Sequence, residues 1–353
     1  MPVFDAIITV DNMNTHRLSA FLAVFAFAAV SGRGEETITR IALGSCANQN
    51  RDQPVWEAIA AEDPQLFLFL GDNVYADTED RDEMRAAYEK LEQKPGFRAL
   101  RAMCPVIGVW DDHDYGVNDG GADYPAKEMA EEEFHRFFRT PDDAPSRKRP
   151  GTYDVRYFGE GDRRLQVILL DTRYFRGPLK KLPVRGPDGP YERQTDPAVT
   201  MLGDAQWRWL AKTLRQPAGM RIILSSIQVI PEDHRWELWQ NLPHERARLF
   251  RLLKEAETGP VIFLSGDRHM GEISELPASD PLSPGFPVYE LTSSGLTNAG
   301  GGRRGEPNRH RVSPTNFQKR NFGMVRIDWE NRIATLELRD VEGNLADSYE
   351  AKW

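Results

Sequence analysis

From residue 37 onward, the chain alternates between short, uninterrupted apolar runs and longer amphipathic segments. The apolar runs predict buried strands at residues 38–46, 66–72, 106–114, 165–172, 221–226 and 261–267. Amphipathic segments predict helices at residues 53–61, 81–91, 126–138, 204–214 and 244–254. Strands that alternate with helices in this way are typical of an α/β fold.

The last part of the chain has a different pattern. Residues 289–293, 323–329 and 333–339 read as strands with little helix between them. A mixed sheet, or two packed sheets, is therefore favoured over a purely parallel one. No repeat or linker divides residues 35–353, so we expect a single domain there. Two long segments rich in proline, glycine and charge, residues 176–200 and 300–314, are expected to be loops that border a site.

The first 34 residues have the pattern of a targeting segment. Residues 21–30 form a ten-residue apolar run, and a bilayer span takes about 20 residues. Arg17 precedes the run and the small residues Ser31 and Gly32 follow it, as in a secretory signal peptide. We expect removal of this segment and export to the periplasm or the outside, with translation starting at Met1 or Met13. A buried core helix is the alternative.

Composition and charge narrow the class of protein. Hydrophobic residues make up 40% and charged residues 28%, which excludes a disordered chain. The net charge of −9 argues against a nucleic-acid-binding module. The two cysteines, Cys46 and Cys104, exclude a disulfide-rich scaffold, although they could pair with each other in an oxidising compartment. We expect a monomer with no membrane span once the signal peptide is removed.

Side chains that can bind metals or move protons follow the predicted strands. In open α/β sheets, ligands bind beyond the carboxyl ends of the strands. These positions hold Cys46; Asp72 and Tyr75; the run Asp111, Asp112, His113 and Asp114; Asp171 with Arg173; and Asp267 with His269. Each of these endings alone is more often a capped turn. Five of them in one chain predict a site.

A bridging carboxylate such as Asp72 can hold two metal ions about 3.5–4 Å apart. Such a pair would clamp a phosphate and supply a metal-activated hydroxide for in-line attack on phosphorus. Cys46 and Tyr75 have unperturbed pKa values of about 8.5 and 10, so their joint deprotonation favours a strongly polarising ion such as Fe³⁺. An oxygen-rich half-site of Asp72, Asp112 and Asp267 suits Ca²⁺. Zn²⁺, Mn²⁺ and Mg²⁺ are alternatives.

The ordered set of motifs resembles the PhoD-like alkaline phosphatases of the calcineurin-like metallophosphoesterase superfamily. The resemblance covers residues 38–340. It is carried by GSC at 44–46, GDNVY at 71–75, WDDHD at 110–114, LDTRY at 170–174, GDRH at 266–269, ELTSSGLT at 290–297 and NFGMVRIDW at 321–329. It implies a four-layer αββα sandwich of two mixed sheets flanked by helices.

The resemblance also implies roles for individual residues. It assigns Fe³⁺ to Cys46, Asp72, Tyr75 and His269, and Ca²⁺ to the neighbourhood of Asp72, Asp112 and Asp267. It implies that His113 contacts the phosphate or protonates the leaving group, and that Asp114 orients His113. Separately, the planar guanidinium of Arg173 could bind phosphate, or it could brace Asp171 in the fold.

Two positions depart from the pattern of the family. Gln228 and His234 stand in the region where a metal-binding histidine is expected, and Asn298 stands where many relatives have histidine. Either departure could change the substrate or weaken the second metal site.

These observations predict an exported phosphoester hydrolase that acts on small phosphoesters or on cell-envelope phosphodiesters. One alternative is a phosphodiesterase or phospholipase-like enzyme acting on teichoic acid, nucleotides or lipid head groups. A non-enzyme alternative is a metal-stabilised protein that binds phosphorylated ligands. A third is a structural secreted domain in which the acidic residues bind Ca²⁺ only to stabilise the fold.

Overall fold

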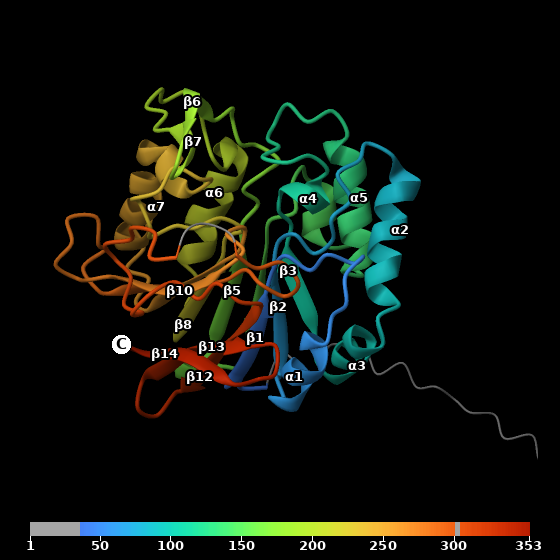
Figure 1. Cartoon of the computed structure of the whole chain (residues 1–353). Helices are drawn as coiled ribbons and strands as arrows, with labels where there is room; N and C mark the ends of the chain where they lie inside the picture. Colours follow the sequence, from blue (N-terminus) through green and yellow to red (C-terminus); the bar gives the residue numbers. More distant parts are fainter. Residues whose placement is uncertain (1–35, 301–303) are drawn as a thin grey trace, which may run out of the picture. The chain divides into compact units, whose positions relative to one another are not determined.

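The computed structural model describes residues 36–300 and 304–353 (Figure 1). The predicted signal peptide lies outside these residues. The strands are β1 (Arg40–Gly44), β2 (Leu66–Leu70), β3 (Val106–Val109), β4 (Asp154–Phe158), β5 (Leu165–Leu169), β6 (Lys180–Gly186), β7 (Gly189–Glu192), β8 (Met220–Leu224), β9 (Val261–Ser265), β10 (Gly271–Leu276), β11 (Val288–Ser293), β12 (Asn321–Asp328), β13 (Ile333–Asp340) and β14 (Leu345–Lys352). The α-helices are α1 (Val55–Ala61), α2 (Arg81–Glu92), α3 (Pro95–Met103), α4 (Asp112–Tyr115), α5 (Lys127–Phe137), α6 (Gly203–Leu214) and α7 (Pro243–Glu255). In this described part, every helix is too short or too polar to cross a membrane.

Two six-stranded mixed sheets form the centre of the fold. The first has the order β14-β13-β12-β1-β2-β3, and the second has the order β10-β11-β9-β8-β5-β4. Strands β1, β2 and β3 are parallel in the first sheet, as are β5, β8, β9 and β11 in the second. The carboxyl ends of these parallel strands are where ligands bind in α/β folds.

The alternation of side chains along each strand produces the layers. In β2, Leu66, Leu68 and Leu70 join a core that contains residues of both sheets, whereas Phe67 and Phe69 face the core under the helices. Residues of α1, α2, α3 and α5 share that second core, and residues of α6 and α7 form a third core with the other sheet. Figure 1 shows these two groups of helices on opposite sides of the strands. The predicted αββα sandwich is confirmed.

The predicted elements correspond closely to those observed, with differences at their ends and in the loops. The run predicted as a strand at 106–114 ends at Val109, because a new helix, α4, begins at Asp112. The predicted loop at 176–200 contains the β6–β7 hairpin. Pairing is mixed in both sheets, because β12 joins β1 as an antiparallel strand in the first sheet, and β4 and β10 join as antiparallel strands in the second. Cys46 and Cys104 are both buried and are not linked by a disulfide.

Candidate metal centre

The residues of the predicted motifs follow the carboxyl ends of parallel strands from both sheets. Cys46 comes after β1, Asp72 after β2 and Asp112 after β3, while Asp267 and His269 follow β9. Four of the five have a positive φ: 61° at Cys46, 49° at Asp72, 67° at Asp267 and 52° at His269. Residues other than glycine rarely adopt this left-handed backbone conformation. Such strained residues cluster at functional sites, where the surrounding structure holds them in place. The backbone conformation therefore indicates that these strand ends form a functional site.

Cys46, Asp72, Tyr75 and His269 form one compact group. The Asp72 carboxylate accepts hydrogen bonds from the Cys46 thiol at 3.4 Å and from the Tyr75 hydroxyl at 3.1 Å. The Tyr75 hydroxyl oxygen also lies 3.0 Å from Nε2 of His269. The candidate ligand atoms of Cys46, Asp72 and His269 all lie within 4.8 Å of one another. The four residues expected to hold iron are thus brought together.

Burial changes the protonation of this group in the metal-free chain. Burial and the nearby Cys46 raise the pKa of Asp72 well above its ordinary value. Burial also raises the pKa of the Cys46 thiol to about 11, and burial together with Asp72 raises the pKa of Tyr75. Burial lowers the pKa of His269 to about 4, so its imidazole stays neutral and can bind a metal. A bound cation would lower the pKa values of the thiol, phenol and carboxyl groups, because it stabilises their charged forms.

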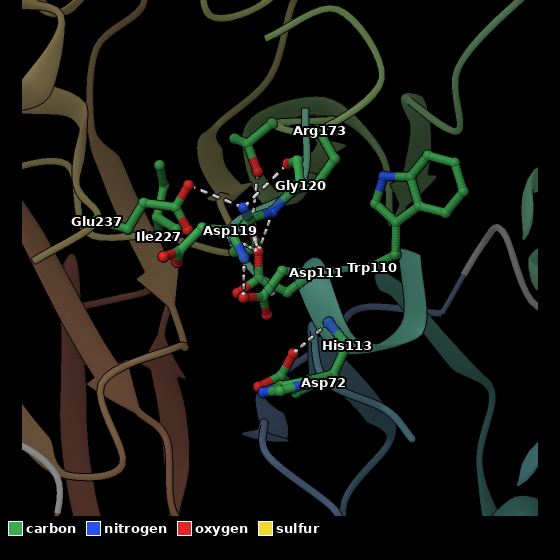
Figure 2. A network of polar contacts seen from close by, with 12 residues as sticks. Asp72, Trp110, Asp111, His113, Asp119, Gly120, Arg173, Ile227 and Glu237 are labelled. Atoms are coloured by element: carbon green, nitrogen blue, oxygen red, sulfur yellow. Dashed lines mark hydrogen bonds and ion pairs between the residues drawn. The ribbon is translucent and has the colours of Figure 1, made fainter. Parts of the chain in front are cut away.

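A second group shares Asp72 with the first. Asp72, Asp112 and His113 offer ligand atoms within 4.8 Å of one another, and so do Asp112, Asp119 and Glu237. The backbone N–H of His113 donates to Oδ1 of Asp72 at 3.4 Å (Figure 2), and that of Asp119 donates to Oδ2 of Asp112 at 2.8 Å. Asp112 could be predicted here from the sequence, whereas Asp119 and Glu237 could not, because no motif distinguishes them.

The oxygen atoms of this second group fit a bound cation. Asp112 is 3% exposed, and among the described residues its Oδ1 atom has no hydrogen-bond partner. A buried carboxylate oxygen without a partner costs free energy unless a cation or a water satisfies it. Asp72 occupies the position of a ligand that bridges two ions, because it belongs to both groups. The residues present therefore fit a two-metal centre, and the oxygen-rich group suits a hard divalent ion.

A cleft of about 370 Å³ opens onto both groups. Its lining includes Asp72, Asp112, His113, Asn118, Asp119, Arg185, Pro190, Tyr191, Trp236, Glu237, Asp267, Arg268 and His269. Asp267 is partly exposed here, and removal from water together with the nearby Asp111 raises its pKa well above the ordinary value. Asp267 lies outside the three compact ligand groups that the described residues form. It contributes to the wall of the cleft.

His113 lies in the wall of the cleft with one ring nitrogen held by a carboxylate. Its Nδ1 lies 2.7 Å from Oδ1 of Asp77. Burial opposes protonation of His113, but the hydrogen bond to Asp77 outweighs it and raises the pKa of His113 to about 9. Asp114 was expected in this orienting role. Its carboxylate instead accepts from the backbone N–H of Asp111 at 2.7 Å, within the capping box of α4. Asp77 therefore replaces Asp114 as the residue that orients His113.

Arg173 is fully buried behind the cleft (Figure 2). Its Nε donates to Asp111 at 2.6 Å, and its two terminal nitrogens donate to Glu237 at 2.8 and 2.6 Å. One of these nitrogens also donates to the carbonyl oxygen of Gly120. All three guanidinium nitrogens thus have protein partners, which favours a bracing role for Arg173 over the alternative of a phosphate contact. The braced carboxylates belong to Asp111 and Glu237, whereas Asp171 accepts from the backbone N–H of Arg173.

The two departures from the family pattern lie outside the lining of the cleft. Nε2 of His234 is 2.9 Å from the amide oxygen of Gln228, whose nitrogen donates to Glu272 at 2.7 Å. His234 lines a neighbouring cavity of about 490 Å³. Asn298 is buried, and its side-chain oxygen accepts from the Thr297 hydroxyl at 3.4 Å. None of these side chains takes the place of a metal-binding histidine in the cleft.

Gly71, which immediately precedes Asp72, is required by the local backbone. Its φ is +95°, and a Cβ atom there would lie 2.4 Å from Cβ of Asp111. Gly71→Ala is therefore expected to lower the free energy of unfolding by about 2–5 kcal/mol, the sum of left-handed strain and overpacking. Chemical denaturation measures this loss.

Gly259→Ala is the matched control for Gly71→Ala. Gly259 also has a positive φ, +68°, but a Cβ atom would meet nothing within 4 Å. Only the conformational strain remains, so the expected loss is about 1–2 kcal/mol. If the two variants lose the same free energy of unfolding, the close approach of Gly71 to Asp111 does not contribute to the loss.

Two mixed sheets lie between helical layers and carry a thiol, carboxylates and histidines at their strand ends, an arrangement that fits a metal-binding protein. The sequence profile of the PhoD-like phosphatases matches residues 41–338, so the chain belongs to the PhoD-like phosphatase family. Family and site together indicate a metal-dependent phosphoesterase. No curated protein matches the chain in sequence.

Three solved structures share the fold. The structure of PhoD matches with a TM-score of 0.67 and 16% identity, covering 91% of this chain and 69% of that one. GAP50, described as the anchor in the inner membrane complex of Plasmodium, matches with a TM-score of 0.54 and 12% identity over 90% of this chain and 89% of its own. A dimetal phosphatase from Danio rerio matches with a TM-score of 0.51 and 14% identity, covering 90% of this chain and 100% of that one.

Proposed function

We propose that this chain hydrolyses phosphate esters at a two-metal centre that Asp72 bridges. The observation that carries the proposal is the position of Asp72, whose ligand atom lies within 4.8 Å of those of Cys46 and His269 on one side and of Asp112 on the other, beside one cleft. When bound, the two ions would neutralise the phosphate and lower the pKa of the attacking water. Hydrolysis consumes that water: its oxygen bonds to phosphorus, the ester P–O bond breaks, and a proton ends on the leaving alcohol.

Other residues of the site donate the proton to the leaving group or hold the site in position. His113 is the group that donates the proton to the leaving oxygen, because Asp77 keeps its imidazole protonated near neutral pH. Asp77 fixes the ring from Nδ1, which leaves Nε2 for the substrate. Arg173 is a positioning residue: it holds Asp111 and Glu237 at the back of the site. Asp114, which was predicted to orient His113 directly, is proposed instead to cap the helix that carries His113.

The proposed metals are Fe³⁺ at Cys46, Asp72, Tyr75 and His269, and Ca²⁺ at the oxygen-rich group. A thiolate and a phenolate in one site favour a strongly polarising ion, and the hydrogen bonds from both groups to Asp72 support this ligand set. Asp112, Asp119 and Glu237 supply oxygen atoms of the kind that Ca²⁺ prefers, and Asp267, in the wall of the cleft, is the further predicted ligand. Zn²⁺, Mn²⁺ and Mg²⁺ remain alternative occupants.

Metal analysis combined with spectroscopy tests this assignment. The purified chain is expected to contain about one iron per molecule and to show the visible charge-transfer band of a phenolate bound to Fe³⁺. Tyr75→Phe should abolish the band, whereas Tyr289→Phe, a control at a buried tyrosine on β11, should keep it. Removal of the metals with a chelator should abolish hydrolysis of an aryl phosphate. A colourless zinc protein would exclude the Cys46–Tyr75 iron site while keeping the phosphoesterase.

Export completes the proposal. The apolar run at residues 21–30, with a basic residue before it and small residues after it, supports a signal peptide that directs the chain to the periplasm or the outside. N-terminal sequencing of the chain recovered from cell fractions tests this directly. A chain that starts at Met1 or Met13 in the cytosolic fraction would contradict export.

The fold alone does not separate an enzyme from a binding protein, because one structural neighbour is described as an anchor. The proposal of catalysis depends on the side chains in the cleft. Both a monoesterase and a phosphodiesterase would use these residues, and cell-envelope phosphodiesters belong to the proposed substrates. Metal-dependent melting without turnover on mono-aryl or bis-aryl phosphates would favour the non-enzyme alternative.

A further inference from the structure

Two arginines stand among the many carboxylates of the cleft. The lining includes Asp72, Asp112, Asp119, Glu237 and Asp267, and the arginines in it are Arg185 and Arg268. The carboxylates gather at the metal groups, so bound cations would balance them there. The two arginines are therefore available for a different task from charge balance at the metal centre.

Arg268 belongs to a rigid wall built from three side chains. Its terminal nitrogen donates to Glu306 at 2.6 Å, and the indole nitrogen of Trp236 donates to the other oxygen of Glu306 at 3.2 Å. The Arg268 guanidinium also lies over the Trp236 ring, 5.4 Å from its centroid. Arg268 is 5% exposed, and among the described residues its Nε has no hydrogen-bond partner. Arg268 also lines the cleft, so its guanidinium is a charged donor beside the space where a ligand would lie.

Arg185 reaches the same aromatic ring from a different part of the chain. It lies on β6 of the β6–β7 hairpin, which Figure 1 shows projecting from the body of the fold. Its guanidinium lies over the Trp236 ring, 4.7 Å from the centroid. Arg185 is exposed on this strand, so its donors are accessible to a ligand. Trp236 thus carries two guanidinium groups at the cleft, each with donors to offer.

We propose that Arg185 and Arg268, held by Trp236, form a subsite for a second phosphoryl group of the substrate. The proposal rests on the proposed function, because it takes the reacting phosphate to lie at the metal groups. Arg268 stands between Asp267 and His269 in the sequence, so the subsite adjoins the reacting phosphate. The preferred substrate is then a phosphoester whose leaving group carries another phosphate after a short linker.

The chemistry of the subsite selects phosphate over an aromatic group. The Trp236 ring contacts two guanidinium groups, so positive charge is concentrated beside it. A planar guanidinium can give two parallel hydrogen bonds to phosphate oxygens, and such charged hydrogen bonds are among the strong ones in proteins. The second phosphate could belong to a small bisphosphate or to the neighbouring unit of a phosphodiester chain. Both present the same group to the two arginines.

Matched substrates with and without the second phosphate test the subsite. The metal-loaded chain is assayed for phosphate release from propanediol monophosphate and propanediol bisphosphate. We expect kcat/KM to be about tenfold higher for the bisphosphate, the value of one added hydrogen bond to a charged group. Arg185→Ala should remove most of this preference, and higher salt should reduce it. Lys181→Ala, which removes an exposed charge from the same strand outside the cleft, should keep it.

The outcomes separate this inference from the proposed function. No release from either substrate would mean that the proposed function fails. Equal kcat/KM for both substrates, or an Arg185→Ala variant with an unchanged ratio, would overturn the subsite while the phosphoesterase stands. A parallel assay uses the bisphosphate with each phosphate capped as a methyl diester. Preference for the capped form indicates a phosphodiester chain as the source of the second phosphate, and preference confined to the uncapped form indicates a small bisphosphate.

Discussion

Replacement of Asp72 by asparagine is expected to lower kcat/KM for phosphoester hydrolysis by about 10³-fold or more. Loss of one group that stabilises charge in a transition state costs about 10²–10³-fold, and a ligand shared by two ions serves two such functions. Asp72 belongs to both ligand groups and accepts hydrogen bonds from Cys46 and Tyr75. Steady-state assays of the metal-loaded variant on an aryl phosphate measure the loss.

The same substitution should stabilise the metal-free chain. Asp72 is 1% exposed and lies near other acidic groups, which include Asp112, Asp111 and Asp114. Its raised pKa means that the folded state holds a proton that the unfolded state releases, so the stability that this group contributes falls as pH rises. An asparagine has no proton to lose. The melting temperature of the metal-free Asp72→Asn chain should therefore exceed that of the parent, and the difference should grow from pH 5 to pH 8.

Asp204→Asn serves as the control, because Asp204 is exposed in the first turn of α6. It should leave turnover unchanged, and the melting temperature should shift little, as is usual for surface substitutions. A metal-free Asp72→Asn chain that melts below the parent would show that the carboxylate is well paired without cations. Retained activity in that variant would exclude Asp72 as a bridging ligand.

The order of elements could be predicted from the sequence because each buried strand carries its own signal. Leu66–Leu70 is apolar at every position, which is the pattern of a strand covered on both faces. The β6–β7 hairpin could not be predicted in this way. Its first strand, Lys180–Gly186, is largely exposed, contains a proline and lacks a continuous apolar run. Its pairing depends on the turn and on contacts with residues about 45 positions away, such as the hydrogen bond between Tyr191 and Arg235.

The candidate site was predictable where a side chain directly follows a strand. Cys46, Asp72 and His269 are of this kind, because strand ends meet at one edge of a sheet. Asp119, Glu237 and Asp77 lie in loops, and only the packing of those loops brings them to the cleft. The orientation of side chains was also beyond prediction. Whether the guanidinium of Arg173 faces a substrate or the protein depends on two carboxylates that are 62 and 64 positions away.

Replacement of Arg173 by methionine is expected to lower the free energy of unfolding by about 3–5 kcal/mol, the usual cost of removing one partner from a buried ion pair. Arg173, Asp111 and Glu237 are each at most 3% exposed, so Asp111 would remain in the interior without its cation, and Glu237 would keep only Arg176. Chemical denaturation of the metal-free chain measures the loss. Arg208→Met, at an exposed position of α6, is the control and should change stability by about 0.5 kcal/mol or less.

A second substitution separates the loss of charge balance from the loss of packing. If the loss of charge balance is the cause, Arg173→Met combined with Glu237→Gln should recover part of the lost stability. One of the two carboxylates that have lost their contact with Arg173 then becomes neutral. If the loss comes only from packing, the two substitutions should be additive. Arg173→Lys keeps the charge but cannot contact Asp111 and Glu237 with the same planar fork, so its stability should lie between those of the parent and the methionine variant. A methionine variant as stable as the parent would mean that Arg173 does not brace the site, and would return it to the expected contact with phosphate.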